Sequence, residues 1–424
     1  MISHQTLSFL MTLVFVIGYF LITIEHYTKV NKATCALLMA VLCWIIQFEG
    51  LQYTADENIR HLGTHVSGVS QVVFFLIGAL TIVETINVHQ GFKIVSDAIS
   101  VSSKKALLWA TGLIAFFLSS VLDNLTTTIV MVTILQKLLD DKQDRMLIGG
   151  GIVIAANAGG AWTSIGDVTT TMLWIGGQIS SFKVMKELFL PSLACFAASF
   201  FILSLFLKGA FVKKNVVDEQ PSEPGGTVIF CMGLAVLIFV PIFKALTGLP
   251  PFMGVLFGLG ILWLITDFLH SHDDKRSHLR IPSVLTKIDL SSVIFFLGIL
   301  LCVDALETAG ILEELDHFLG RTIGNLSIIA VTLGVASAVI DNVPLVAAAI
   351  SMYDFTEIPK DASFWHLIAY TAGTGGSLLI IGSAAGVVYM GLEKVDFFWY
   401  LKRISLSALV GYVAGLIVYF LTSS

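Results

Sequence analysis

Long apolar runs without charge alternate with short polar connectors along the whole chain. Two clear examples are LSFLMTLVFVIGYFLITI at 7–24 and LFLPSLACFAASFFILSLFL at 188–207, and neither contains a charged residue. About 18 uncharged apolar residues are enough to cross the core of a bilayer as a helix. A helix of a soluble protein would carry polar residues on its outer face, which these runs lack. The pattern therefore predicts an all-α polytopic membrane protein.

The apolar runs divide into ten predicted full spans and two regions of a different kind. The spans lie at 7–24, 33–49, 68–87, 147–176, 188–208, 227–243, 251–267, 291–307, 363–391 and 401–421. The first follows MISHQT, without a basic leader or a small-residue cleavage site, so we expect a retained helix. The other two regions, 106–136 and 323–351, each carry an acidic residue between two apolar arms.

The distribution of Lys and Arg indicates how these two regions meet the membrane. If each enters and leaves by the same face, 18 of the 24 basic residues fall on one side and 6 on the other. If both cross fully, the asymmetry weakens. Basic residues gather on the cytoplasmic side of membrane proteins. We therefore predict two re-entrant hairpins in a multi-pass protein of the cell inner membrane, with both termini periplasmic.

The second half of the chain repeats the first at an offset of about 220 residues. The matching pairs are VVFFLIGALTIVE (72–84) with VIFFLGILLCVD (293–304), SSVLDNLTTTIV (119–130) with SAVIDNVPLVAA (337–348), and NAGGAWTSIGD (157–167) with GTGGSLLIIGS (373–383). Each half has five full spans and one hairpin, so the second half starts from the opposite face. We predict two inverted-topology repeats, 1–211 and 227–424, joined by a cytoplasmic linker at 212–226. Transporters with this architecture bind their substrate where the repeats meet.

Each hairpin contains an Asp-Asn pair between apolar arms, Asp123-Asn124 and Asp341-Asn342. A carboxylate in hydrocarbon costs several kcal/mol or more unless it is paired, solvated or neutralised. One explanation is that each Asp caps the second arm by accepting backbone N–H bonds, and Pro344 suits the first turn of such an arm. The other is that the Asp-Asn tips contact the transported species. The two explanations are compatible.

A glycine-rich segment follows each hairpin, ANAGGAWTSIGDVTTT at 156–171 and TAGTGGSLLIIGSAAG at 371–386. Each glycine costs about 1 kcal/mol in a helix interior, so we expect both spans to be interrupted there. The alternative is that the glycines allow helices to pack closely. Unwound backbone is tolerated in a membrane where it lines a wet cavity, and its carbonyls can then help to coordinate a cation. The candidate ion- and proton-binding residues are Ser119, Asp123, Asn124, Asn157, Thr163, Ser164, Asp167, Ser337, Asp341, Asn342, Thr374, Ser377 and Ser383.

Charge in these segments favours a cation over an anion. They contain three carboxylates, Asp123, Asp167 and Asp341, and no Lys or Arg. We expect Na⁺ or Li⁺ at Asp123, Asp167 and nearby carbonyls and hydroxyls. A buried carboxylate can also take up a proton, because burial disfavours its charged form. One site that holds either ion would exchange Na⁺ for H⁺.

For the other titratable residues, the sequence does not decide between two or more roles. Glu84 and Asp304 end matching spans, and either lie solvated at the membrane edge or belong to a proton path. His270, His272 and His278 lie in a predicted cytoplasmic loop, where they are solvated, sense pH or bind a metal.

The chain has no nucleotide-binding loop and no metal-ligand spacing, so we predict neither an enzyme nor a bound cofactor. The expected partners are the lipid bilayer and monovalent cations, with no nucleic acid.

The paired segments SSVLDN…NAGGAWTSIGD and SAVIDN…GTGGSLLIIGS resemble the NhaD-type sodium/proton antiporters of the ion transporter superfamily. The resemblance covers about residues 5–422. It implies two re-entrant hairpins, two interrupted helices, a homodimer formed by a scaffold domain and an elevator-like motion. It also implies a function in pH homeostasis. The residues that the resemblance implies in Na⁺ or H⁺ handling are Ser119, Asp123, Asn124, Asp167, Ser337, Asn342 and Ser377.

The resemblance leaves two other transport functions to consider. The dicarboxylate branch of the superfamily typically carries Ser-Asn-Thr at its hairpin tips, whereas both tips here carry Asp-Asn. This departure speaks against a carboxylate substrate. The alternatives to Na⁺(Li⁺)/H⁺ antiport are Na⁺-coupled transport of a dicarboxylate or other organic anion, and efflux of a metalloid such as arsenite.

Overall fold

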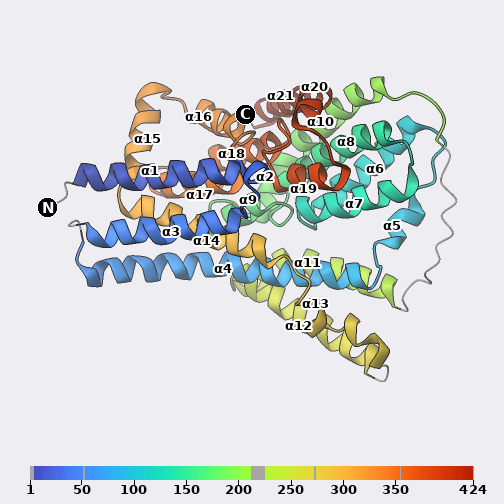
Figure 1. The fold of residues 1–424 in the computed structure, drawn as a ribbon, viewed down its shortest axis with the longest axis horizontal. Helices are drawn as coiled ribbons and strands as arrows, with labels where there is room; N and C mark the ends of the chain where they lie inside the picture. The colour runs from blue at the N-terminus through green and yellow to red at the C-terminus, as the bar shows by residue number, and fades with distance from the viewer. Residues whose placement is uncertain (1–3, 51–52, 212–224, 272–273, 354, 424) are drawn as a thin grey trace.

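The computed structural model describes all residues except 1–3, 51–52, 212–224, 272–273, 354 and 424, so most of the predicted linker lies outside the described residues. The described chain is built of α-helices (Figure 1). Eight described helices are long and apolar enough to cross a membrane: α1 (His4–Thr23), α3 (Lys32–Glu49), α4 (Ala55–Val88), α10 (Ser181–Phe206), α11 (Gly226–Thr247), α12 (Pro251–His270), α14 (Leu290–Thr308) and α21 (Ser405–Thr422). They correspond to eight of the ten predicted full spans. The predicted all-α polytopic membrane fold is confirmed.

Each region predicted as a hairpin forms two short helices. The first contains α6 (Lys104–Ser119) and α7 (Asn124–Leu138), and the second contains α16 (Leu326–Ala336) and α17 (Asn342–Met352). Figure 1 shows α6 and α7 toward the end of the molecule that holds α5 (Lys93–Ala98), and α16 and α17 toward the end that holds the N-terminus. This placement is the one expected of hairpins that enter from opposite faces. The inverted relation of the two halves, and their division at 212–226, remain predictions.

Both glycine-rich spans are interrupted inside the predicted segments, just after Gly159 and Gly160 in the first and at Gly376 in the second. The first consists of α8 (Lys142–Ala161) and α9 (Val168–Ile175), and the second of α18 (Ser363–Gly375) and α19 (Ala384–Glu393). Gly159 therefore lies inside α8, where an added Cβ would be 2.1 Å from the carbonyl oxygen of Phe116 in α6. An added Cβ on Gly375 would be 2.0 Å from the carbonyl oxygen of Gly334 in α16. These glycines allow close packing of each hairpin, and the helix breaks after them.

Several predicted boundaries were wrong. The connector predicted at 50–67 is largely the first part of α4, because Thr54 and Glu57 form a reciprocal capping box that starts this helix at Ala55. The connector predicted at 308–322 contains α15 (Ile311–Thr322), which is bent by 116° relative to α16. The remaining short helices are α2 (Glu25–Thr28), the 3-10 helix η1 (Asp274–Leu279), α13 (Ile281–Val284) and α20 (Phe397–Arg403).

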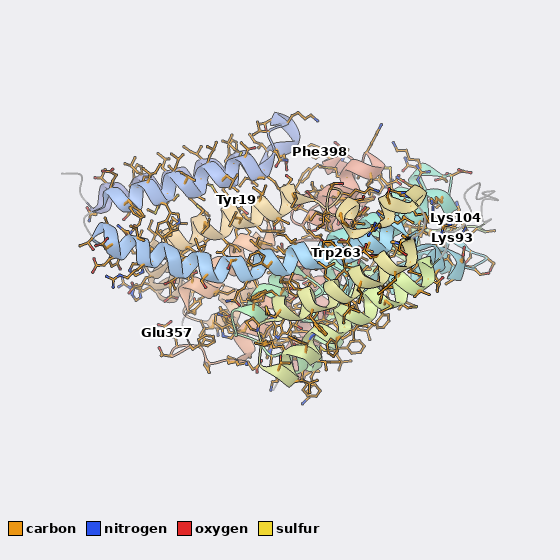
Figure 2. All side chains as sticks on the ribbon, turned by 90° about the horizontal axis from the view of Figure 1, so that it is seen from below. Tyr19, Lys93, Lys104, Trp263, Glu357 and Phe398 are labelled. Carbon is orange, nitrogen blue, oxygen red and sulfur yellow. The ribbon has the colours of Figure 1, made fainter. Side chains whose placement is uncertain are left out.

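Helix packing brings the hairpins and interrupted spans together near the centre of the molecule. Helix α7 packs against α8 and α19, helix α17 packs against α9 and α18, and α8 packs against α18 and α19. Helices α3, α4, α11, α12 and α14 pack against one another beside this group. Figure 2 shows Lys93 and Lys104 together at one end of the long axis and Glu357 toward the other. The breaks of α8/α9 and α18/α19 thus face the tips of the hairpins.

Candidate ion-binding site

Four short polar side chains begin the helices that follow the hairpin tips and the breaks. Asp123, Asp341, Asp167 and Ser383 are the N-caps of α7, α17, α9 and α19 and accept backbone N–H bonds of 2.7, 3.3, 3.1 and 3.2 Å. A helix leaves its first N–H groups without partners, and a cap satisfies one of them. The capping role predicted for both hairpin aspartates is therefore confirmed. Any role in ion binding rests on the remaining oxygen lone pairs.

Asp167 lies at the centre of the group and is almost fully buried. Its Oδ2 atom accepts a hydrogen bond of 3.0 Å from Asn124 Nδ2, at the first hairpin tip. The same atom accepts a longer bond of 3.5 Å from Asn342 Nδ2, at the second tip. Hydrogen bonds from neutral amides to a carboxylate are charge-assisted and stronger than neutral pairs. One carboxylate is therefore bonded to both hairpins.

Asn157 of α8 connects the same group to the second interrupted span. Its Nδ2 atom donates to Ser377 Oγ at 2.8 Å and to Ser383 Oγ at 3.0 Å. Its Oδ1 atom accepts from Asn124 Nδ2 at 2.9 Å. An amide offers two donor hydrogens and one acceptor oxygen, so both ends of Asn157 are used. The result is a continuous polar cluster, which we call the Asp167 cluster: Asn124, Asn157, Asp167, Asn342, Ser377 and Ser383.

The other hydroxyl-bearing candidates lie outside the Asp167 cluster's hydrogen bonds. Ser119, Thr163, Ser337 and Thr374 donate to backbone carbonyl oxygens at 2.6, 2.7, 2.8 and 2.6 Å. Such bonds fix helices and breaks in place. Ser164 donates to Ser181 at the start of α10, at 3.0 Å. In this conformation the five hydroxyls therefore bond outside the Asp167 cluster, and a role of these residues in ion binding remains a prediction.

Asp123 faces a cavity instead of bonding to Asp167. Its carboxylate accepts the backbone N–H of Thr126 and, at 2.6 Å, the hydroxyl of the same residue. It is half-buried and lines an inner cavity of about 70 Å³ together with Asn124. The inner cavity shares Lys32, Asp289 and other residues with an outer cavity of about 470 Å³. Asp123 is thus the cavity-facing carboxylate of the first hairpin.

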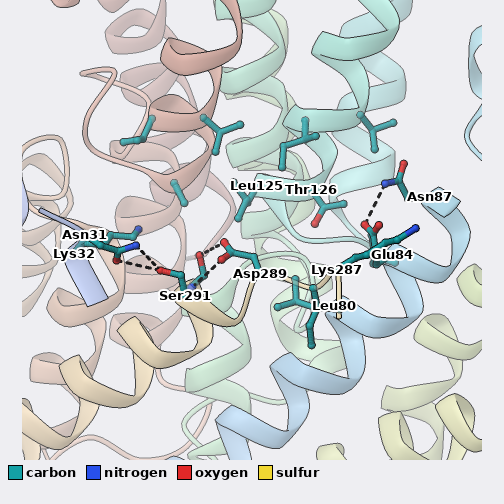
Figure 3. Close-up of a pocket in the computed structure, with 18 of the residues that line it drawn as sticks. Asn31, Lys32, Leu80, Glu84, Asn87, Leu125, Thr126, Lys287, Asp289 and Ser291 are labelled. Atoms are coloured by element: carbon teal, nitrogen blue, oxygen red, sulfur yellow. Dashed lines mark hydrogen bonds between the residues drawn. The ribbon is translucent and has the colours of Figure 1, made fainter. Parts of the chain in front are cut away.

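The outer cavity opens at the surface, because Lys287 and Asp289 in its lining are exposed. Figure 3 shows Lys32 on one side of this cavity and Glu84 on the other. Glu84 Oε2 accepts a hydrogen bond of 3.1 Å from Asn87 Nδ2. Glu84 thus lines the outer cavity, which shares residues with the inner cavity that Asp123 lines. A proton path through Glu84 is compatible with this position and remains a prediction.

Lys32 is a charged residue of the site that sequence reasoning missed. Its Nζ atom lies 3.9 Å from Asp341 Oδ2 and 4.3 Å from the ring centroid of Phe295. The expectation that the carboxylates have no basic partner is therefore wrong for Asp341. The only sequence signal was the position of Lys32 directly before the apolar run at 33–49. Nothing in the linear pattern connects it with a residue of the second hairpin.

Asp304 lies in a different group from its sequence counterpart Glu84. Its Oδ1 atom is 3.3 Å from His65 Nδ1. One ligand atom each from His65, Asp304 and Glu307 lie within 4.8 Å of one another. Imidazole nitrogens and carboxylate oxygens are common ligands of divalent metal ions. Glu307, however, is exposed. The structure therefore does not bring Asp304 into the Asp167 cluster.

The loop histidines do not form one solvated face. His270, at the end of α12, is 3% exposed, and its Nε2 atom lies 3.0 Å from Nε2 of His89. The expectation of a solvated side chain is wrong for His270. His272 lies outside the described residues.

Comparison with known proteins identifies the family. The citrate transporter family matches residues 18–356. Sodium/proton antiporter 1 of Arabidopsis thaliana is 52% identical over 412 residues, covering 96% of this chain and 71% of the relative. Sodium/proton antiporter 2 of the same plant is 49% identical over 414 residues, covering 96% and 98%. The Na(+)/H(+) antiporter NhaD of Vibrio cholerae is 30% identical over 456 residues, covering 99% and 92%. The chain belongs to the family of NhaD-type sodium/proton antiporters.

Proposed function

We propose that this chain exchanges Na⁺ or Li⁺ for H⁺ across a membrane and exports Na⁺. The observation that carries the proposal is the position of Asp167, buried and bonded to an asparagine from each hairpin. Its relatives over nearly the full length are named sodium/proton antiporters. Asp123, which faces the inner cavity, supplies a second carboxylate on the same side of the cluster.

The exchange follows from competition for the same oxygens. An ionised carboxylate attracts Na⁺, and amide and hydroxyl oxygens are hard donors that suit such an ion. A proton on the same carboxylate removes its charge and one of its acceptor sites. Na⁺ and H⁺ therefore exclude each other at Asp123 and Asp167. Because Asp167 is bonded to both hairpin tips, the identity of the bound ion alters contacts with both halves of the chain.

Transport of a dicarboxylate is the second candidate, because the citrate transporter family also matches the chain. A dianion needs net positive charge or free helix N-termini. Among the described residues that line the inner cavity, Lys32 is the only Lys or Arg, and Asp123 and Asp289 line it too. Lys32 is already paired with Asp341. The charge of the cavity therefore favours a cation.

We propose that the protein lies in the cell inner membrane with the end that carries Lys93 and Lys104 in the cytoplasm. Basic residues gather on that side, and the N-terminus lies at the opposite end of the long axis (Figures 1 and 2). Both termini would then be periplasmic. Reporter fusions at each terminus, active either in the periplasm or in the cytoplasm, test this orientation.

The exchange is tested with purified protein in proteoliposomes that contain a pH-sensitive dye. We expect Na⁺ and Li⁺, but not choline, to dissipate a preformed pH gradient, and Asp167→Asn to abolish the effect. Asp396→Asn is the matched control, because Asp396 also caps a helix, α20, with bonds of 2.9 and 3.2 Å. Na⁺-dependent uptake of labelled citrate or succinate without cation/proton exchange would replace the proposal with the second candidate. Arsenite transport without Na⁺ dependence would replace it with metalloid efflux.

A further inference from the structure

Lys32 is held at the junction of the two cavities by the first turn of α3. The preceding residue, Asn31, caps this helix by accepting the N–H of Ala33 at 2.8 Å. Its Nδ2 atom donates to Ser291 Oγ of α14 at 2.8 Å, and the backbone N–H of Lys32 donates to Glu25 Oε1 at 3.1 Å. The backbone of Lys32 is therefore fixed, while its four-carbon stem and ammonium lie along both cavities (Figure 3).

The ammonium of Lys32 lies between a carboxylate and an aromatic face. Its Nζ atom is 3.9 Å from Asp341 Oδ2 and 4.3 Å from the Phe295 ring centroid. The side chains of Lys32 and Asp341 are 21% and 15% exposed. Both contacts are attractive for an ammonium group. At 3.9 Å the ammonium makes a long ion pair and not a close hydrogen bond, so it is held near Asp341 mainly by charge.

The charges around the cavities are unequal in the two hairpins. Asp123 lines the inner cavity, and no ion pair to Lys or Arg is found for it in the part of the chain that the structure describes. Asp341 is paired with Lys32. A transported cation that reaches the inner cavity therefore meets one hairpin whose carboxylate is open to it and one whose carboxylate is already neutralised.

We propose that Lys32 is a tethered cation that sets the cation affinity of the transport site by occupying Asp341. In this conformation its ammonium takes the place of a second Na⁺ or proton at the second hairpin. A transported cation is then held on the Asp123 and Asp167 side alone. The inference rests on the proposed cation exchange and names a residue that determines its affinity.

The proposal predicts opposite effects for the two partners. Without the ammonium, Asp341 has lost its ion pair and attracts cations from the cavities that Lys32 lines. Without the carboxylate, the ammonium is unpaired and repels them. Removing both leaves the local charge as it is in the native pair, so the two effects should cancel in the double variant. The double variant therefore distinguishes an effect of the charges of the pair from an effect of either side chain alone.

The test measures ²²Na⁺ binding to purified protein in detergent and, in parallel, Na⁺-driven proton movement in proteoliposomes. We expect Lys32→Gln to bind Na⁺ about fivefold more tightly and Asp341→Asn about fivefold more weakly, the size typical of a partly exposed ion pair. The double variant and Lys32→Arg should lie close to the native protein. Lys287→Gln is the matched control, because Lys287 lines the outer cavity but not the inner one.

The two readouts separate the inference from the proposed function. Unchanged or weaker Na⁺ binding by folded Lys32→Gln overturns the inference, and so does a double variant that binds Na⁺ as tightly as Lys32→Gln or as weakly as Asp341→Asn. A change in Lys287→Gln as large as that in Lys32→Gln also overturns it, because any basic residue near the cavities would then do the same. Native protein that binds Na⁺ but moves no protons overturns the proposed function instead, and the comparison of binding constants still decides the role of Lys32.

Discussion

Asn342 donates a hydrogen bond of 3.5 Å to Asp167, which joins the tip of the second hairpin to the interrupted span of the first half. Asn124, at the tip of the first hairpin, donates to the same oxygen atom at 3.0 Å. Both hairpins therefore meet at one carboxylate, and its charge affects both. A cation or proton at Asp167 competes with amide donors from both halves of the chain.

The first prediction concerns Asp167 itself. Asp167→Asn should lower Na⁺/H⁺ exchange at least about tenfold, because an amide can neither take up a proton nor neutralise Na⁺. Asn is as good a helix N-cap as Asp, so α9 should still form and the protein should remain folded. Exchange is measured with the pH-gradient assay, and folding by the melting temperature in detergent. Exchange at the native rate in folded Asp167→Asn would remove Asp167 from the ion site.

The second prediction concerns the amide of Asn157. Asn157→Ala removes three buried hydrogen bonds, one each with Asn124, Ser377 and Ser383. Buried polar groups without partners cost about 1–3 kcal/mol each, so the melting temperature should fall clearly. Ser164→Ala is the control, because it removes one partly buried bond, to Ser181. Equal melting temperatures for the two variants would show that the Asp167 cluster does not stabilise the fold.

The sequence predicts the local features of the site well. Helix caps, interrupted spans and hairpin tips depend on a few neighbouring residues, and the repeat showed them twice. Asp123 and Asp341 thus cap the second arms of the hairpins as predicted, and the structure adds Asp167 and Ser383 as caps of α9 and α19. The breaks lie inside the predicted glycine-rich segments, although Gly159 itself stays helical, where it allows the close approach of Phe116 in α6.

Contacts between distant helices could not be predicted from the sequence. The pairing of Lys32 with Asp341, and of His65 with Asp304, depends on how α3 and α4 pack against the second half. Side-chain direction is equally hidden, so the sequence did not show that Ser164 bonds to Ser181. A periodic pattern identifies which face of a helix is polar but not which residue lies opposite.

The third prediction compares two glycines inside helices. Gly159→Ala should destabilise the protein by about 1–3 kcal/mol, the usual effect of overpacking, because its Cβ would lie 2.1 Å from Phe116 O. Gly63→Ala, in α4, should be neutral or stabilising by up to about 1 kcal/mol, because an added Cβ there meets nothing within 4 Å and alanine favours a helix. The melting temperatures of both variants measure the difference. A Gly159→Ala protein as stable as Gly63→Ala would mean that α6 and α8 can move apart without loss.

The last prediction concerns Glu84, which lines the outer cavity and is bonded to Asn87. Glu84→Gln should raise the Na⁺ concentration needed for half-maximal exchange a few-fold, because a negative charge in a cavity raises the local concentration of cations. The effect should shrink in high choline chloride, since salt screens charges beyond about 10 Å at 0.1 M. Glu313→Gln is the control, because Glu313 is 78% exposed on α15. If Glu84→Gln instead abolished exchange at every salt concentration, Glu84 would carry the proton itself, and the proton path would run through the outer cavity to Asp123.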